Sequence, residues 1–226
     1  MDYRIISIGT LSQNEFWGET APVRTPHATT TLIRSNGRNI LVDPGLPAQV
    51  IGARLMERAG ITPKQITDVF LTNFRPAHRW GLDAFEHADW WIAEMEREIV
   101  GRGLVEQMKQ ATDTGDTKAQ EVLRQEVALM RRFKPAPDGL AVQVDLFQLS
   151  GFTPGTCGLL LLKLNSTTLI AGDAVPTSEH MEHGQVLRQA CDVAQARESF
   201  AEAIEIADVI IPGHDNLLLN PTRRPM

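Results

Sequence analysis

Hydrophobic and polar positions follow two different periods along this chain, and the change between them predicts an α/β protein. Short apolar runs rich in valine, isoleucine and leucine are typical of strands. Such runs occur at residues 4–12, 28–35, 39–42, 67–72, 140–149, 158–164, 167–171 and 209–211. The Asn36-Gly37 pair predicts a tight hairpin turn between the second and third runs.

Stretches with helical periodicity separate these strands. Residues 48–59 carry apolar side chains on one face, and Gly60 is a typical end signal for such a helix. A further helix is predicted at residues 193–206, just before the last strand. Because strands and helices alternate, we expect layers of helix and sheet rather than a sandwich built of strands alone.

The stretch from residue 90 to residue 133 differs in composition from its surroundings. It is rich in Glu, Arg, Lys, Gln, Met and Leu and predicts two amphipathic helices, at about residues 92–111 and 117–133. A turn-rich break separates them. We interpret the pair as a helical insertion, at about residues 92–134, within one domain that spans residues 1–226.

Composition narrows the classes of protein that fit. A 226-residue chain that is 42% hydrophobic and 22% charged can bury a core, and its net charge of −6 argues against binding to nucleic acid or to an anionic membrane. No apolar run approaches the roughly 20 residues of a membrane-spanning helix, and the N-terminus lacks the pattern of a secretion signal. Cys157 and Cys191 are too few for a disulfide scaffold. We therefore expect a cytoplasmic protein.

Five short segments carry most of the recognisable chemistry. They are Ile-Leu-Val-Asp-Pro-Gly at residues 40–45, a strand and loop at 68–81, Ser-Gly-Phe-Thr-Pro-Gly-Thr at 150–156, Leu-Ile-Ala-Gly-Asp at 169–173, and Ile-Ile-Pro-Gly-His at 210–214. In this order and spacing they resemble the metallo-β-lactamase superfamily. The resemblance implies a four-layer αββα sandwich. It also implies hydrolysis of an ester, lactone, thioester or phosphoester with bound metal ions.

The chain departs from the family pattern at most of the metal ligands. Where the family has His-x-His-x-Asp-His, this chain has Asn73, Arg75 and Ala77, and only His78 keeps the family's residue type. Phe152 stands where the third segment of the family has a histidine. The resemblance thus implies that the family's first metal site is lost. Arg75 would also place a permanent positive charge there.

Three of the four residues of the family's second metal site remain. They are His78, Asp173 and His214. Two imidazoles and a carboxylate suit one zinc or iron ion and leave a position open for water. Our first hypothesis is therefore a small-molecule hydrolase with a single metal, in which His78, Asp173 and Arg75 are the catalytic candidates. Ala77 weakens this hypothesis, because it removes a ligand and a group that would orient the water.

Two other interpretations stay open. The chain can be a catalytically inactive relative that binds a ligand or partner through the remodelled cleft. It can also be a metal-free enzyme that uses Arg75, His78 and Asp173 in acid–base chemistry. Structural roles compete with these: His78 as a loop histidine, Asp173 as a loop cap, and Arg75 as a buried partner of Asp173 or Asp43 or as a clamp for a substrate anion.

The remaining candidates have plainer interpretations. Asn73 is expected to be a hydrogen-bonding replacement for its histidine, and Phe152 to fill the space of a histidine and metal. We expect His180 and His183 to lie in a solvated acidic segment rather than to bind metal, and Cys157 to be a core residue. The helical hairpin could be a lid over the cleft or an arm that forms a homodimer.

Overall fold

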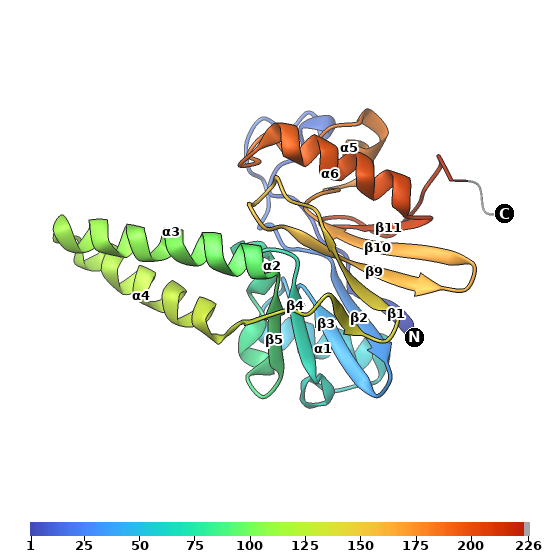
Figure 1. Cartoon of the computed structure of the whole chain (residues 1–226), viewed down its shortest axis with the longest axis horizontal. Helices are drawn as coiled ribbons and strands as arrows, with labels where there is room; N and C mark the ends of the chain where they lie inside the picture. The colour runs from blue at the N-terminus through green and yellow to red at the C-terminus, as the bar shows by residue number, and fades with distance from the viewer. Residues whose placement is uncertain (224–226) are drawn as a thin grey trace.

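Two six-stranded sheets face each other at the centre of the protein, and helices pack on their outer faces (Figure 1). This computed structural model describes residues 1–223. The first sheet has the order β1 (Asp2–Ser7), β2 (Thr30–Ser35), β3 (Arg38–Val42), β4 (Asp68–Leu71), β5 (Asp89–Ile92) and β6 (Lys134–Pro135). The second has the order β12 (Leu218–Leu219), β11 (Val209–Pro212), β10 (Ser166–Gly172), β9 (Cys157–Lys163), β8 (Val144–Gln148) and β7 (Gly139–Ala141). The predicted four-layer αββα architecture is confirmed.

Six α-helices of the described residues accompany the sheets. They are α1 (Ala48–Ala59), α2 (Pro76–Arg79), α3 (Glu94–Asp113), α4 (Thr117–Arg132), α5 (Ser178–His183) and α6 (Val193–Ile206). Short 3-10 turns lie at Glu15–Trp17, Pro63–Gln65 and Leu82–Phe85. None of the helices within residues 1–223 has both the length and the apolar character to span a membrane.

Strands buried on both faces explain the continuous apolar runs of the sequence. In β3, Ile40 and Val42 join the cluster between the two sheets, whereas Leu41 packs in the cluster that contains Ile51 of α1. In β10 the same alternation places Ile170 between the sheets, while its neighbours pack with α6 in the outer layer. The middle of each sheet is therefore packed on both faces. This packing holds the strand ends, and the loops that follow them, in fixed positions.

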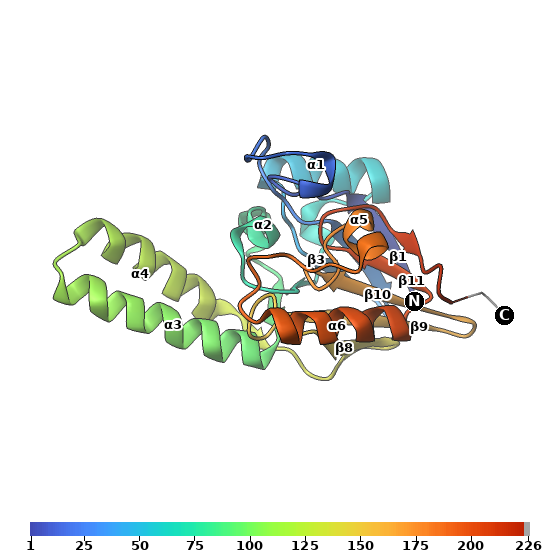
Figure 2. The same cartoon turned by 90° about the horizontal axis from the view of Figure 1, so that it is seen from above.

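The helices α3 and α4 form a hairpin that projects from the body of the protein, as Figures 1 and 2 show. Their observed bounds lie within two residues of the predicted ones. Thr114-Gly115-Asp116 connects them, and Gly115 has a φ of +70°, which glycine adopts without strain. After α4 the chain returns to the first sheet, where β6 pairs with β5. The hairpin is thus inserted between two neighbouring strands of the first sheet, β5 and β6.

Several predicted strands have different bounds in the structure. The run at 140–149 is not one strand but the antiparallel pair β7 and β8, because Gln143 turns the chain with a φ of +63°. No glycine, asparagine or proline marks that turn, so the sequence carried no signal for it. The strand β5 was not predicted, since its four residues adjoin a long helical pattern. The first strand ends at Ser7, and beyond it Thr10 makes one isolated bridge to His27.

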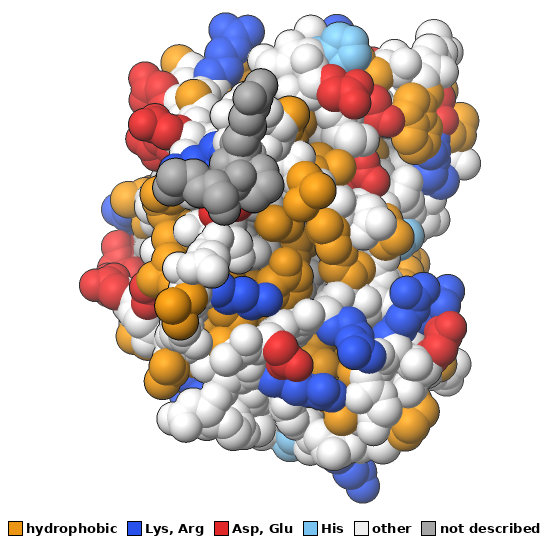
Figure 3. Space-filling model, turned by 90° about the vertical axis from the view of Figure 1, so that its right-hand side faces the viewer, with side chains coloured by type: hydrophobic (Ala, Val, Ile, Leu, Met, Phe, Trp, Pro, Cys, Tyr) orange, Lys and Arg blue, Asp and Glu red, His pale blue; other side chains and the backbone are white. Residues whose placement is uncertain are grey.

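The candidate ligands lie at one end of the sandwich, and exposed hydrophobic residues lie at the other. Asp173 follows the carboxyl end of β10, whereas Leu164 lies in the turn that precedes this strand, at its opposite end. Figure 3 shows the molecule from the side away from the hairpin, where hydrophobic side chains lie exposed among charged ones. Leu164 and Leu219 are among the exposed apolar residues, at 100% and 76%. All three candidate ligands follow the carboxyl ends of strands, where the two sheets meet their loops.

The two cysteines lie in different surroundings, and we expect their thiols to react at different rates. Cys157 is buried in the cluster between the sheets, and burial raises the pKa of its thiol to about 12. Cys191 is exposed, although partial burial also raises the pKa of its thiol, which donates a hydrogen bond to the carbonyl oxygen of Gly151. Since the reagent must reach the sulfur before a thiolate can react, titration of the native protein with Ellman's reagent should detect one rapid thiol, and a second only after unfolding. Two rapid thiols in the native protein would contradict the burial of Cys157.

Candidate metal centre

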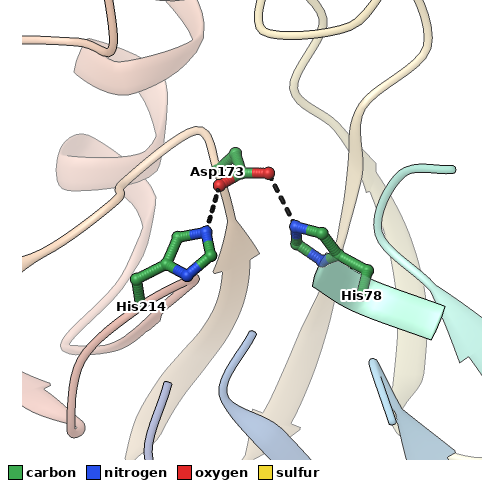
Figure 4. Close-up of side chains that lie close together, drawn as sticks. All are labelled: His78, Asp173 and His214. Carbon is green, nitrogen blue, oxygen red and sulfur yellow. Dashed lines mark hydrogen bonds and ion pairs between the residues drawn. The ribbon is translucent and has the colours of Figure 1, made fainter. Parts of the chain in front are cut away.

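Three distant segments bring their side chains together in one buried centre (Figure 4). His78 lies in α2, after β4, while Asp173 and His214 follow β10 and β11. Their exposed fractions are 0%, 2% and 7%, so the centre is almost closed to solvent. The parallel pairing of β10 with β11 sets Asp173 beside His214, and the facing sheet supplies His78.

The carboxylate of Asp173 stands between the two imidazole rings. His78 Nε2 lies 2.7 Å from Asp173 Oδ2, and His214 Nε2 lies 2.8 Å from Asp173 Oδ1. One ligand atom from each residue lies within 4.8 Å of the others, and no other group of His, Cys, Asp or Glu in residues 1–223 is arranged in this way. The structure therefore gathers the three residues that the sequence analysis selected as ligands.

Contacts behind the rings fix the orientation of both histidines. His78 Nδ1 lies 3.1 Å from Asp43 Oδ2, and Thr72 donates to the same carboxylate through its hydroxyl and its backbone N–H. His214 Nδ1 lies 3.1 Å from the carbonyl oxygen of Thr10 and 3.0 Å from that of His27. Because these oxygens accept hydrogen bonds, each Nδ1 carries a proton. Each Nε2 consequently faces Asp173.

This arrangement calls for positive charge at the centre. With neutral rings, two Nε2 lone pairs would face a carboxylate, and the side-chain amide of Asn73 would donate between His78 Nε2, at 3.3 Å, and Asp173 Oδ2, at 2.8 Å. A metal ion or protons on the rings would supply the remaining positive charge. Burial opposes charge on His78, but the carboxylates of Asp43 and Asp173 outweigh it and raise the pKa of His78 to about 10. Burial likewise favours the neutral acid of Asp173, yet His78 and His214 hold its pKa far below the ordinary range.

Asn73 completes the contacts of Asp173. Its side-chain amide donates to Asp173 Oδ2 at 2.8 Å, and its carbonyl oxygen accepts the backbone N–H of Arg75 at 3.0 Å. Asn73 is fully buried. The predicted role of Asn73 as a hydrogen-bonding replacement for a histidine is confirmed by these contacts.

The prediction that Arg75 is buried against Asp173 or Asp43 is wrong. Its side chain is exposed, and its guanidinium lies 5.4 Å from the centre of the Phe152 ring. Both carboxylates are already satisfied by histidines and by polar donors of the loop after β4. Phe152 is 7% exposed and packs with Leu11 and Leu187. Arg75, a catalytic candidate of the sequence, thus lies outside the group formed by the three ligands.

The prediction of a solvated segment around His180 and His183 is wrong for His180, whereas His183 is exposed as predicted. His180 is 2% exposed in α5, where Thr177 caps the helix and contacts its ring. The rings of His180 and His183 lie 4.9 Å and 4.4 Å from the ring of Phe16. Phe16 is too distant in sequence for a local pattern to reveal this packing.

Glu96 is a buried residue that the sequence analysis missed. It lies at the start of α3 with no exposed surface. Its carboxylate accepts hydrogen bonds from Phe74 N at 2.9 Å, Thr153 Oγ1 at 2.7 Å and Gly155 N at 3.0 Å. The sequence offers no signal for this role, because Glu96 is one of many acidic residues in a charged helical stretch. Through Glu96 the hairpin holds the loops that contain Asn73 and Phe152.

Comparison with known proteins agrees with this architecture. The sequence model described as the metallo-beta-lactamase superfamily matches residues 24–214. The chain belongs to this superfamily. No curated protein sequence matches it.

Solved structures of the superfamily share the fold over most of the chain. A protein from Thermotoga maritima assigned as a metallo-beta-lactamase is 18% identical, with a TM-score of 0.66 over 96% of this chain and 98% of that one. The hydrolase AbOPH is 16% identical, with a TM-score of 0.65 over 99% and 91%. An N-acyl homoserine lactone hydrolase with N-hexanoyl-L-homoserine at its catalytic metal centre is 18% identical, with a TM-score of 0.62 over 94% and 92%. At these identities the likeness shows the fold.

The residues of this centre fit a metal ion. The donor set of two imidazoles and one carboxylate is one that zinc and iron accept. The contact of His78 Nδ1 with the carboxylate of Asp43 is the support that metal-binding histidines commonly have. The carbonyl groups behind His214 serve the same purpose.

Proposed function

We propose that the chain is a hydrolase that uses one metal ion, zinc or iron, to cleave an ester, lactone, thioester or phosphoester. The observation that carries this proposal is the orientation of the two rings. Acceptors fix the Nδ1 side of His78 and of His214, and both Nε2 atoms meet the carboxylate of Asp173. Neighbouring structures named as lactone hydrolases support the substrate class.

The roles of the residues follow from their contacts. His78, Asp173 and His214 would hold the ion, which supplies Lewis acidity to a water or to a substrate oxygen. Asp43 holds the proton of His78 on Nδ1 and so directs Nε2 toward Asp173, and Asn73 orients the carboxylate of Asp173. These supports are fixed before substrate binds, which is the arrangement that favours an efficient electrostatic site.

A second candidate function has its own observation in favour. Asp173 accepts a hydrogen bond from Asn73, lies 2.7 Å and 2.8 Å from the Nε2 atoms of His78 and His214, and belongs to an almost fully buried group. With both rings protonated, the group would form an ion cluster that needs no metal. In that case the chain would be an inactive member of the superfamily that binds a ligand in its cleft.

Metal binding distinguishes the two candidates. Protein purified without a histidine tag and treated with EDTA should bind one zinc or ferrous ion per chain, measured by elemental analysis after dialysis. The bound ion should also raise the melting temperature, because a ligand at a thousand times its Kd stabilises the native state by about 4 kcal/mol. Hydrolysis of p-nitrophenyl acetate and of a γ-lactone should follow the metal content.

The matched variants are His214→Ala, which removes a ligand, and His183→Ala, which removes an exposed histidine outside the centre. We expect His214→Ala to lose metal uptake and hydrolysis, and His183→Ala to keep both. Absence of stoichiometric metal in the unmodified protein, together with an unchanged melting temperature on adding zinc or iron, would favour the metal-free candidate.

A further inference from the structure

A cleft separates the helical hairpin from the loops of the metal centre. Its volume is about 320 Å³, which falls in the range of small-molecule sites. Loop residues on one side, among them Arg75 and Cys191, and hairpin residues on the other, among them Val100 and Val122, line it. Figures 1 and 2 show the hairpin leaving the body of the protein beside α2.

The walls of the cleft are largely apolar. Phe74, Pro76 and Pro154 come from the loops near the centre, and Val100 and Val122 come from the two helices of the hairpin. Val122 of α4 lines the cleft and is 59% exposed, so its apolar side chain is accessible to a ligand there. An aliphatic group that enters the cleft would therefore remove apolar surface from water on both partners.

Arg75 is the charged residue of the cleft that is available to bind an anion. Arg79 and Glu126 pair with each other at 2.5 Å, and the carboxylate of Glu96 is occupied by its three donors. Arg75 is exposed and makes no ion pair with any of residues 1–223. Its planar guanidinium is suited to a carboxylate, which it can bind through two parallel hydrogen bonds.

Arg75 also stands next to the metal centre. Its backbone N–H donates to Asn73, whose amide donates to Asp173. The Arg75 guanidinium packs over the ring of Phe152, so part of its position is fixed. We propose that this cleft binds an aliphatic carboxylate, with the apolar chain against Val100 and Val122 and the carboxylate on Arg75. Binding itself needs no metal, whereas the step of placing such a carboxylate on a substrate that also has a hydrolysable ester or lactone rests on the proposed function.

The exposed thiol of Cys191 gives a reporter inside the cleft. We would measure the rate at which iodoacetamide modifies Cys191 in EDTA-treated protein, with octanoate or 1-octanol added as matched probes. Octanoate should slow the modification at lower concentrations than octanol does, because only octanoate can pair with Arg75. Cys157 is buried and does not contribute to the signal.

Variants separate the charge from the apolar walls. Arg75→Gln should weaken protection by octanoate about tenfold or more, as expected for loss of a charge-assisted hydrogen bond, and leave protection by octanol unchanged. Val122→Asp should weaken protection by both probes. Arg102→Gln, which removes an exposed arginine of α3 outside the cleft lining, should change neither.

Each other outcome is decisive. Equal protection by octanoate and octanol, or no effect of Arg75→Gln, would overturn the assignment of Arg75. Protection by neither probe would overturn the cleft as a binding site. Because the protein is free of metal in these measurements, failure of the metal hypothesis would leave their result untouched.

Discussion

Replacing Glu96 with alanine is expected to lower the free energy of unfolding by about 3–5 kcal/mol. The substitution removes the acceptor for three donors, Phe74 N, Thr153 Oγ1 and Gly155 N, where a cavity would form around a residue with no exposed surface. Each buried donor left without a partner costs about 1–3 kcal/mol, and water that enters the cavity offsets part of the sum. Urea denaturation followed by tryptophan fluorescence measures the difference.

Two variants of the same helix serve as controls. Glu98→Ala removes an exposed carboxylate and should change stability by no more than about 0.5 kcal/mol. Glu96→Gln keeps one acceptor oxygen in place and should lie between the native protein and Glu96→Ala. A loss below about 1 kcal/mol for Glu96→Ala would mean that the hairpin does not hold the loops through this carboxylate.

The close packing around Glu96 explains why the effect should extend beyond the lost hydrogen bonds. A Cβ on Gly155 would lie 2.1 Å from Glu96 N, so the loop and the first turn of α3 are in direct backbone contact. Phe74 adjoins Asn73, and Thr153 adjoins Phe152. A shift of this contact would therefore move both loops beside the metal centre. We expect Glu96→Ala to lower stability and, if the proposed metal site binds zinc, to lower its zinc affinity as well.

The parts of the fold that depend on local patterns could be predicted from the sequence. The helix at residues 193–206 and the two helices of the hairpin were predicted to within two residues, because their periodicity and breaks are local. The grouping of His78, Asp173 and His214 could be predicted because each follows a strand within a segment that resembles the superfamily.

Features that depend on contacts between distant residues could not be predicted. The exposure of Arg75 follows from the saturation of Asp43 and Asp173 by other donors, which only the assembled loops reveal. The burial of Glu96 follows from loops that join α3 from two sides. A periodic pattern identifies an acidic helix face but does not identify which carboxylate on it is enclosed.

Replacing Asp173 with asparagine is expected to have the largest effect on the centre. The substitution keeps the size of the side chain but removes the negative charge between His78 and His214. If the rings are protonated in metal-free protein, the substitution leaves His214 without its carboxylate and His78 with Asp43 alone, and loss of a buried ion pair costs about 3–5 kcal/mol of stability. It also removes a charged ligand, and we expect zinc affinity to fall by about 100-fold or more. Urea denaturation of EDTA-treated protein and calorimetric titration with zinc measure the two effects separately.

The control is Asp138→Asn, which also removes one negative charge but at an exposed aspartate outside the centre. An effect seen only with Asp173→Asn therefore belongs to the centre and not to the change in net charge. The pair of measurements also separates the two states that the geometry allows. If the metal-free protein is an ion cluster, Asp173→Asn must destabilise it even without zinc, because protonated rings lose their only shared carboxylate. If Asp173→Asn is as stable as the native protein without zinc, the rings are neutral there. That result would favour the metal-binding candidate over the metal-free ion cluster.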